Sequence, residues 1–299
     1  MFSPKLNLVV SPRSGTDASY TPDLNETTLK ILSLLFEFKI ATAIHIARFL
    51  GEDEAYRYLY MKLRRLWQGG LLESLQLYQG TRVGMPVYYM LSKEGLEVVG
   101  RHHHFERSYL KTYPSPKTFI SSNLFQHEAG IVELASLEAR AAHDGCTITF
   151  LGEMSSLSRE ARSDKRVEVF TPDYTVFYQL NNVKETVYTE FERSNKSTTA
   201  ILRKIERYDC NLEPNEREHV TLRLIFDNER MERSFWYTIV MNKPHLAQNI
   251  RILTTNLILV QTTEQFLKPI YATEGSINLR RDGRVIAEVE ERVKLFSNF

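Results

Sequence analysis

The segment Gly69–Glu97, GGLLESLQLYQGTRVGMPVYYMLSKEGLE, decides the fold of the first third of the chain. After its two opening glycines, which commonly end a helix, the apolar run Leu71–Leu77 predicts a strand. Gln79–Gly84 contains two glycines and predicts a turn, and Val87–Leu91 predicts the returning strand. Ser92 predicts the N-cap of a helix that follows. The segment therefore predicts a two-stranded hairpin between two helices.

Upstream of the hairpin, the spacing of apolar residues predicts three helices. The first covers Glu26–Phe38, and its expected N-cap is Asp23 or Asn25. The second is short and covers Ala41–Phe49, and the third spans Asp53–Gln68 and ends at the paired glycines. Together with the hairpin, these helices give the order helix, helix, helix, strand, turn, strand.

This order is that of a winged helix-turn-helix module, because few other small modules end a three-helix core in a hairpin. The sequences GGLLE (69–73) and YYMLSKEGLE (88–97) also resemble winged-helix proteins. The resemblance implies that the third helix enters the major groove of DNA and that the hairpin forms the wing.

The predicted third helix is basic. No acidic residue lies between Ala55 and Glu73, and its apolar residues recur at helical spacing and are expected to pack inward. Arginine binds a phosphate or forms two hydrogen bonds to the edge of a guanine. It can do so from a helix in the groove or from a wing. The residues expected to contact DNA are Arg57, Met61, Lys62, Arg64, Arg65 and Gln68 on the helix and Arg82 in the turn. Two alternatives stay open, an ordinary solvated helix face and a winged helix that binds protein.

Composition indicates a globular protein. The chain has 299 residues, of which 42% are hydrophobic and 25% charged, and this length suits about two domains. The formal net charge is +1, so any nucleic-acid partner must be argued from local clustering of cations. The two cysteines exclude a disulfide framework and favour a reduced, cytoplasmic setting. No apolar stretch reaches about 18 residues, so no membrane span is expected.

Four segments are expected along the chain. Residues 1–22 read as a flexible leader, 23–100 as the winged helix, 101–120 as a linker with three consecutive histidines, and 121–299 as an α/β domain. The last segment predicts, in order, a helix, three strands, a helix and a strand. These elements are Ser122–Ala142, Thr147–Leu151, Val167–Tyr178, Thr186–Glu192, Thr198–Cys210 and Val220–Phe226.

Three carboxylates carry the sharpest chemical signal of this second half. Asp173 follows Pro172, and Glu190 and Glu192 alternate along a predicted strand, so the two glutamates share a face. If the two strands form a hairpin, Asp173 lies close to Glu190. Clustered hard oxygen donors favour Mg²⁺, which activates water in phosphodiester hydrolysis. The alternative is that these carboxylates simply face water.

The pattern resembles the PD-(D/E)xK nuclease superfamily, in which a helix precedes a strand bearing the Asp and a second strand bears Glu-x-Lys. The resemblance implies that Asp173, Glu190 and Glu192 hold the metal, although Glu192 stands where the superfamily has its lysine. Lys204 or Lys196 would then contact the scissile phosphate. Arg193 and Lys196, directly after the acidic strand, are expected to hold a phosphate or DNA. Glu128 is a candidate extra acid. The expected fold class is α+β, a winged helix-turn-helix followed by an α/β restriction-endonuclease-like domain.

A second resemblance covers both halves. The sequences LFQHEAGIVELASLEA (124–139) and YTEFERSNKSTTAILRKIERYD (188–209), with Pro172-Asp173 between them, resemble the replication-relaxation family of mobile-element proteins. That family shows a winged helix, a helix with an early His, a Pro-Asp, an acid-x-acid-Arg strand end and a Lys-x-x-x-Tyr helix. The last pair corresponds to Lys204 and Tyr208, although from the residues alone Tyr208 reads as a packing residue.

Two functions are consistent with these sequence features. The first is a DNA-binding protein of a plasmid, phage or integrative or conjugative element that acts in DNA processing, replication or transfer, with Mg²⁺-dependent cleavage left open. The second is a non-enzymatic transcriptional regulator or accessory factor whose C-terminal domain dimerises or recruits a partner. The expected partners are double-stranded DNA, a second copy of the chain, and a relaxase or replication protein, with no membrane.

Overall fold

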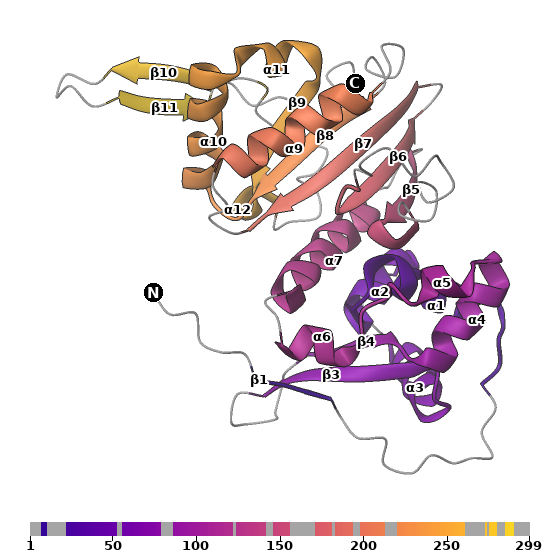
Figure 1. Cartoon of the computed structure of the whole chain (residues 1–299). Helices are drawn as coiled ribbons and strands as arrows, with labels where there is room; N and C mark the ends of the chain where they lie inside the picture. The colour runs from indigo at the N-terminus through magenta and orange to yellow at the C-terminus, as the bar shows by residue number, and fades with distance from the viewer. Residues whose placement is uncertain are drawn as a thin grey trace. The chain divides into compact units, whose positions relative to one another are not determined.

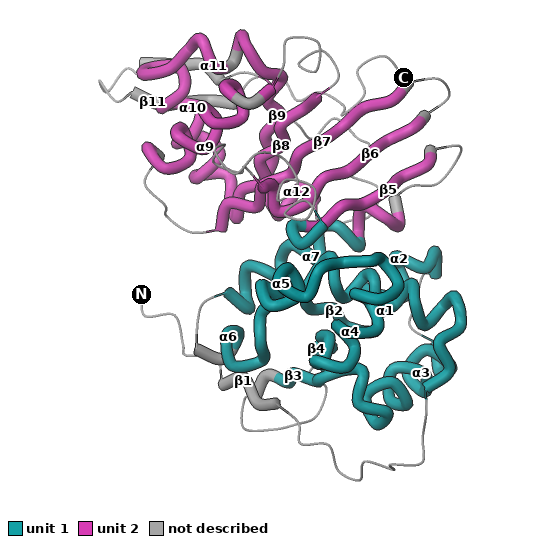
Figure 2. Tube along the Cα trace, turned by 45° about the vertical axis from the view of Figure 1, so that its right-hand side comes forward, with its two compact units in different colours: residues 1–136, 153–164 teal, residues 137–152, 165–299 magenta. Residues whose placement is uncertain are grey.

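The computed structural model describes residues 7–10, 22–52, 56–78, 86–121, 124–141, 146–155, 171–180, 183–193, 198–212, 220–260, 273, 275–279 and 285–289. Within these ranges the chain is mixed α and β, with a four-stranded, a five-stranded and a two-stranded sheet. It divides into two compact units, residues 1–136 with 153–164, and residues 137–152 with 165–299 (Figure 2). None of the helices in these ranges has the length and apolar character needed to cross a membrane.

The first unit combines a helical core with a small antiparallel sheet (Figure 1). Its elements are β1 (Asn7–Val10), α1 (Glu26–Phe38), β2 (Ala41–Thr42), α2 (Ala43–Phe49), α3 (Arg57–Gln68), β3 (Leu72–Tyr78), β4 (Val87–Leu91), α4 (Lys93–His103), α5 (Arg107–Leu110), α6 (Pro116–Ser121) and the first part of α7 (Leu124–Ala141). The order of α1, α2, α3, β3, β4 and α4 confirms the predicted order of elements.

The sheet of the first unit has the strand order β1-β3-β4-β2. The predicted hairpin is confirmed, because β3 and β4 pair antiparallel from Leu72 opposite Leu91 to Gln76 opposite Val87. Strand β1 pairs with the other edge of β3. Asn7–Val10 therefore forms a strand inside the segment expected to be a flexible leader, because the edge of β3 offers unpaired backbone groups.

Two predicted helix starts are confirmed. The Asn25 side chain accepts a hydrogen bond from Thr28 N at 3.1 Å and caps α1. The Ser92 hydroxyl accepts one from Gly95 N at 3.0 Å and caps α4. Gly95 itself is required by a close approach, since a Cβ there would lie 2.2 Å from the Leu71 carbonyl oxygen. The hairpin is thus joined tightly to the helix that follows it.

Residues 101–120, expected to be a linker, are part of the first unit. They contain the end of α4 and the short helices α5 and α6. Tyr113 is buried, and its hydroxyl donates to the carbonyl oxygens of Leu35 at 3.0 Å and Lys39 at 2.8 Å. This segment therefore contributes a buried aromatic side chain to the first unit.

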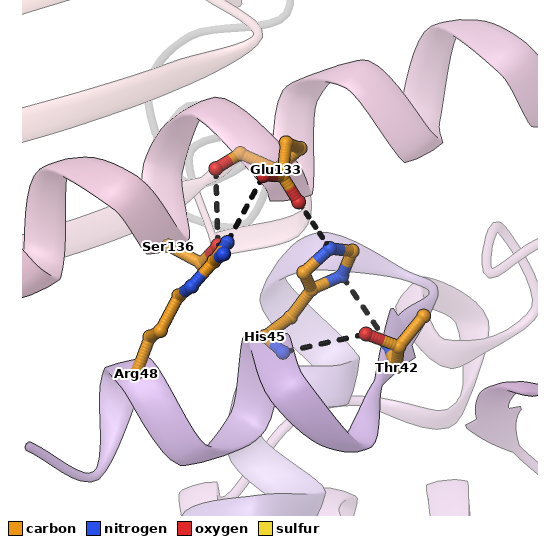
Figure 3. A network of polar contacts seen from close by, with 5 residues as sticks. All are labelled: Thr42, His45, Arg48, Glu133 and Ser136. Atoms are coloured by element: carbon orange, nitrogen blue, oxygen red, sulfur yellow. Dashed lines mark hydrogen bonds and ion pairs between the residues drawn. The ribbon is translucent and has the colours of Figure 1, made fainter. Parts of the chain in front are cut away.

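Helix α7 is attached to α2 by a polar network (Figure 3). Glu133 contacts His45 Nε2 at 2.6 Å and accepts from Arg48 at 3.0 Å, and Arg48 also donates to the Ser136 hydroxyl at 3.2 Å. His45 sits in the first turn of α2, where it forms a capping box with Thr42. The division between the two units falls within α7, after Ser136.

The second unit is built on a five-stranded sheet of order β5-β6-β7-β8-β9 (Figure 1). Strands β5, β6 and β7 pair antiparallel, whereas β7, β8 and β9 pair parallel. The elements are β5 (Cys146–Gly152), β6 (Tyr174–Leu180), β7 (Val183–Glu192), α9 (Thr198–Asn211), β8 (Val220–Phe226), α10 (Glu229–Asn242), α11 (Pro244–Asn249), β9 (Arg251–Asn256), α12 (Leu257–Val260), β10 (Gly275–Leu279) and β11 (Val285–Val289).

The two faces of this sheet are covered differently. Apolar residues of α9, α10 and α11 pack with Leu222, Leu224 and Phe226 of β8 in one core. On the opposite face, Arg223 makes two hydrogen bonds to Glu138 of α7, at 2.7 and 2.6 Å. Both side chains are fully buried. This ion pair fixes the end of α7 on the sheet, and the sequence reading did not anticipate it.

Candidate functional site

Helix α3 presents a basic and partly aromatic surface. As predicted, Leu59, Leu63 and Leu66 are buried. The side chains on the exposed side are those of Arg57, Met61, Arg64 and Arg65, all of which were expected to face outward. Among the described residues, none of these three arginines is paired with a carboxylate, so their guanidinium groups are available to an anionic partner.

Not every expected contact residue of α3 reaches that surface. Lys62 is only 8% exposed, and its ammonium donates to Asn25 Oδ1 at 2.8 Å. Burial lowers the pKa of this ammonium, and the charge of Asp23 opposes that effect. Lys62 was expected on a flank of the helix, but its ammonium is hydrogen-bonded to Asn25, the N-cap residue of α1. Gln68 is partly buried, and Arg82 and Lys196 lie outside the described residues.

The three carboxylates of the second unit do come together around one hairpin. Strands β6 and β7 pair antiparallel with Tyr174 opposite Thr189, so Asp173 lies at the level of Glu190. One Asp173 carboxylate oxygen accepts a hydrogen bond from Phe191 N at 2.7 Å. Glu190 and Glu192 are both buried and share the face of the sheet that α9 covers. The predicted hairpin and the shared face of the two glutamates are confirmed.

Helix α9 supplies the partners of these glutamates. Lys204 donates to Glu190 and, at 3.2 Å, to Glu192. Tyr208 donates to the other Glu190 oxygen at 2.8 Å. Lys204 and Tyr208 lie four residues apart and hence on one face of the helix. Tyr208 was interpreted as a packing residue, and its spacing from Lys204 was the signal that places it in this cluster.

The charges of the cluster are strongly coupled. Burial raises the pKa of the Glu190 carboxyl well above its ordinary value, and the negative charge of Asp173 raises it further. Burial of the ammonium acts to lower the pKa of Lys204, but Glu190, Asp173 and Glu192 prevail and hold it above its ordinary value. The Lys204 ammonium therefore stays charged beside these acidic side chains.

As arranged, these residues do not fit a magnesium ion. Among the described residues, no group of three or more His, Cys, Asp or Glu side chains is placed to hold a metal. Glu190 and Glu192 instead share the Lys204 ammonium, and Asp173 is engaged by a backbone N–H. The position that a cation would take between the glutamates is therefore filled by the chain's own lysine.

Two further residues that were expected near the cluster have other surroundings. Glu128, the candidate extra acid, belongs to the first unit and pairs with Lys39 at 2.6 Å. Arg193 directly follows β7 and is partly buried. The acid of α7 that does reach the sheet is Glu138, ten residues beyond Glu128 on the same helix, and its partner is Arg223.

Comparison with known proteins gives one match. A family model described as replication-relaxation matches residues 32–219, which is more than half of the chain. No curated protein and no solved structure matches the chain. The matched span runs from α1 to the residues just beyond α9, so it contains α3 and every member of the carboxylate cluster.

Proposed function

The chain belongs to the replication-relaxation family, and we propose that it is a DNA-binding protein that acts in the replication, transfer or processing of mobile-element DNA. The family membership confirms the resemblance seen in the sequence and supplies the biological context. The mode of DNA binding that we propose rests on the first unit.

The exposed arginines of α3 carry this proposal. Helix α3 is the third of three helices that precede the β3–β4 hairpin. This order supports a winged helix-turn-helix module. In such a module the third helix lies in the major groove. Arg57 and Arg64 are seven residues apart, so they lie on one side of the helix, two turns from each other. They are placed to contact phosphates or guanine edges along one groove.

Replacing single arginines tests this mode of binding. Arg57→Gln and Arg64→Gln are each expected to weaken binding to a labelled duplex by about fivefold or more, because a lost guanine or phosphate contact costs at least about 1 kcal/mol. Fluorescence anisotropy measures the affinity. Arg233→Gln, which removes an exposed arginine from α10, is the matched control and should leave it unchanged. Wild-type affinity in both α3 variants would refute binding through this helix.

The second unit supports a nuclease-like fold as part of the proposal. Helix α7 precedes the strands, Asp173 stands at the start of one strand, and Glu190 and Glu192 end its neighbour. This is the order in the PD-(D/E)xK superfamily that the sequence resembles. In that superfamily the acids hold a divalent metal, whereas here Lys204 lies against both glutamates.

We therefore propose that Lys204 is a fixed counter-ion that takes the place of a metal in this cluster. Removing one partner of a buried charge cluster leaves the others uncompensated, which is strongly destabilising. This favours the reading in which the second unit is a non-cleaving partner-binding or dimerising domain. The homodimer and the relaxase or replication partner expected from the sequence stay predictions.

Substitution of Lys204 tests the counter-ion role. Lys204→Met is expected to lower Tm by about 5–10 °C, since a loss of about 3 kcal/mol shifts a chain of this size by that amount. Mn²⁺ should restore part of this loss in Lys204→Met, because the freed carboxylates gain a cation, and should leave wild type unchanged. Lys204→Arg keeps the charge and is the control.

A second readout separates this proposal from metal-dependent cleavage. We expect wild-type protein to leave supercoiled plasmid intact with Mg²⁺ or Mn²⁺. If Mn²⁺ stabilises wild type and the plasmid is nicked in a reaction that Asp173→Ala abolishes, the counter-ion proposal is wrong and the cluster is a nuclease site.

A further inference from the structure

Exposed aromatic side chains gather at the start of α3. Of the ten large hydrophobic side chains that are exposed among the described residues, four lie within residues 56–61: Tyr56, Tyr58, Tyr60 and Met61. Tyr58 and Tyr60 are 55% and 53% exposed. Large apolar groups concentrated in this way on a surface usually mark a binding site. The arginine contacts proposed above do not account for them.

Tyr58 is held in a defined orientation. Its ring is parallel to that of Tyr56, with centroids 6.1 Å apart and an interplanar angle of 7°. The Lys62 ammonium lies 5.9 Å from the centroid of the Tyr58 ring. Because these two contacts restrict the ring before a ligand arrives, less conformational entropy is lost when a flat partner stacks on it.

A solvent-open pocket of about 70 Å³ lies between α3 and the start of α1. Its lining combines Tyr58, Met61 and Leu66 with polar and charged groups from both helices. Those groups are Asp23, Asn25, Thr28, Lys62 and Arg65. The pocket thus joins an aromatic wall to hydrogen-bonding groups and carries a cation, Arg65, from the exposed side of α3.

The polar side of the pocket is organised by Asn25. Its Oδ1 accepts from Thr28 N and from the Lys62 ammonium, and its Nδ2 donates to the Asp23 carboxylate at 2.8 Å. Lys62 is more than nine-tenths buried and lines the pocket. The lining of the pocket therefore contains a hydrogen-bond acceptor, Asp23, and a donor, Lys62, together with the aromatic ring of Tyr58.

These groups fit a nucleobase better than a phosphate. The Asp23 carboxylate repels an anion inside the pocket but accepts two parallel hydrogen bonds from the adjacent N1–H and N2–H groups of an unpaired guanine. The Tyr58 ring offers a stacking surface, as aromatic side chains do for unpaired bases. Arg65 is then placed for the phosphate that follows the base.

We propose that this pocket binds one unpaired guanine in DNA that α3 holds. The inference rests on the proposed DNA-binding function and adds to it a preference for DNA with a displaced nucleotide. Such a preference suits a protein that acts where a duplex is opened.

The test compares three labelled duplexes of one sequence: fully paired, with a single bulged guanine, and with an abasic bulge. Anisotropy should show the tightest binding for the bulged guanine. Tyr58→Leu should weaken binding of that duplex by about fivefold or more, because base stacking on an aromatic side chain contributes about 1–3 kcal/mol. Binding of the other two duplexes should change little. Tyr60→Leu is the control, since Tyr60 is equally exposed but does not line the pocket.

The outcomes separate the pocket from the general function. Equal affinity for the three duplexes, or an equal effect of Tyr58→Leu on all of them, overturns the pocket and leaves DNA binding by α3 standing. Absence of binding to every duplex overturns both. Asp23→Asn provides a second check, since it should reduce the preference for a bulged guanine over a bulged thymine without unfolding the first unit. An unchanged preference in this variant contradicts the assigned acceptor.

Discussion

At the scale of single residues, Glu133 links a buried histidine and an arginine to helix α7 (Figure 3). Partial burial acts to raise the pKa of this carboxyl, but the hydrogen bonds and charges of His45 and Arg48 prevail and lower it to about 2. A carboxyl whose pKa is depressed by folding stabilises the folded state above its unfolded pKa, about 4.3. That contribution is lost as the pH falls toward the folded value.

Glu133→Gln is therefore expected to destabilise the protein at neutral pH and to have little effect near pH 2. The Glu133 side chain is 41% exposed, so solvent screening limits the difference to about 1 kcal/mol. Urea unfolding followed between about pH 2 and pH 7 measures it. Parallel stability curves for wild type and variant across this range would contradict the role of Glu133.

The sequence predicted much of the carboxylate cluster, but it did not predict which side chains bind the glutamates. The alternation of Glu190 and Glu192 predicted their shared face, because strand geometry is local. Lys204 stood among the expected site residues because of a resemblance. That Lys204 and Tyr208 both reach Glu190 depends on how α9 lies on the sheet, and this packing follows from the apolar residues on its inner face rather than from any local pattern.

At the scale of elements, the link between α1 and α7 is electrostatic. Lys39, at the C-terminal end of α1, is buried and pairs with Glu128 of α7 at 2.6 Å and with Glu153. Burial acts to lower the pKa of Lys39, but the two carboxylates prevail and raise it. Burial also raises the pKa of Glu128, and the charge of Lys39 opposes that effect. The Lys39 ammonium therefore stays charged inside the first unit.

Lys39→Met should lower the free energy of unfolding by about 3 kcal/mol, because it leaves the buried Glu128 carboxylate without its cation. Chemical denaturation provides the measurement. Lys30→Met is the matched control, since Lys30 is exposed on the same helix and pairs with exposed Glu26. This variant should lose far less stability, because an ion pair in water contributes little. If the two variants lose the same free energy of unfolding, the buried pair between α1 and α7 stabilises the protein no more than an ordinary surface pair does.

Elements with strong local signals were predicted well. Helices α1 and α4 have capping side chains that are visible in the sequence, and the glycines around the hairpin mark its ends. Strand β1 and helices α5 and α6 were not predicted, because each is short and forms through tertiary partners. For β1 that partner is the edge of β3. Between α5 and α6, the Tyr113 hydroxyl bonds to the carbonyl oxygen of Leu35 in α1.

At the scale of the whole molecule, the sequence predicted two parts and placed their junction at residue 121. The structure shows two compact units with the division inside α7. A continuous helix carries no sequence signal where one unit ends, since Glu133 of the first unit and Glu138 of the second lie on the same uninterrupted periodic segment. The family match spans residues from both units.

The salt dependence of the affinity for duplex DNA is the sharpest test of DNA binding by the arginines of α3. Each phosphate that an arginine neutralises adds about 0.9 to the slope of log affinity against log salt. Wild-type protein should bind a duplex tightly, and its affinity should fall steeply as salt is added. In a variant that carries Arg57→Gln, Arg64→Gln and Arg65→Gln, the slope should fall by about one for each arginine that contacts a phosphate. If this triple variant keeps the wild-type affinity and slope, the arginines of α3 do not hold DNA.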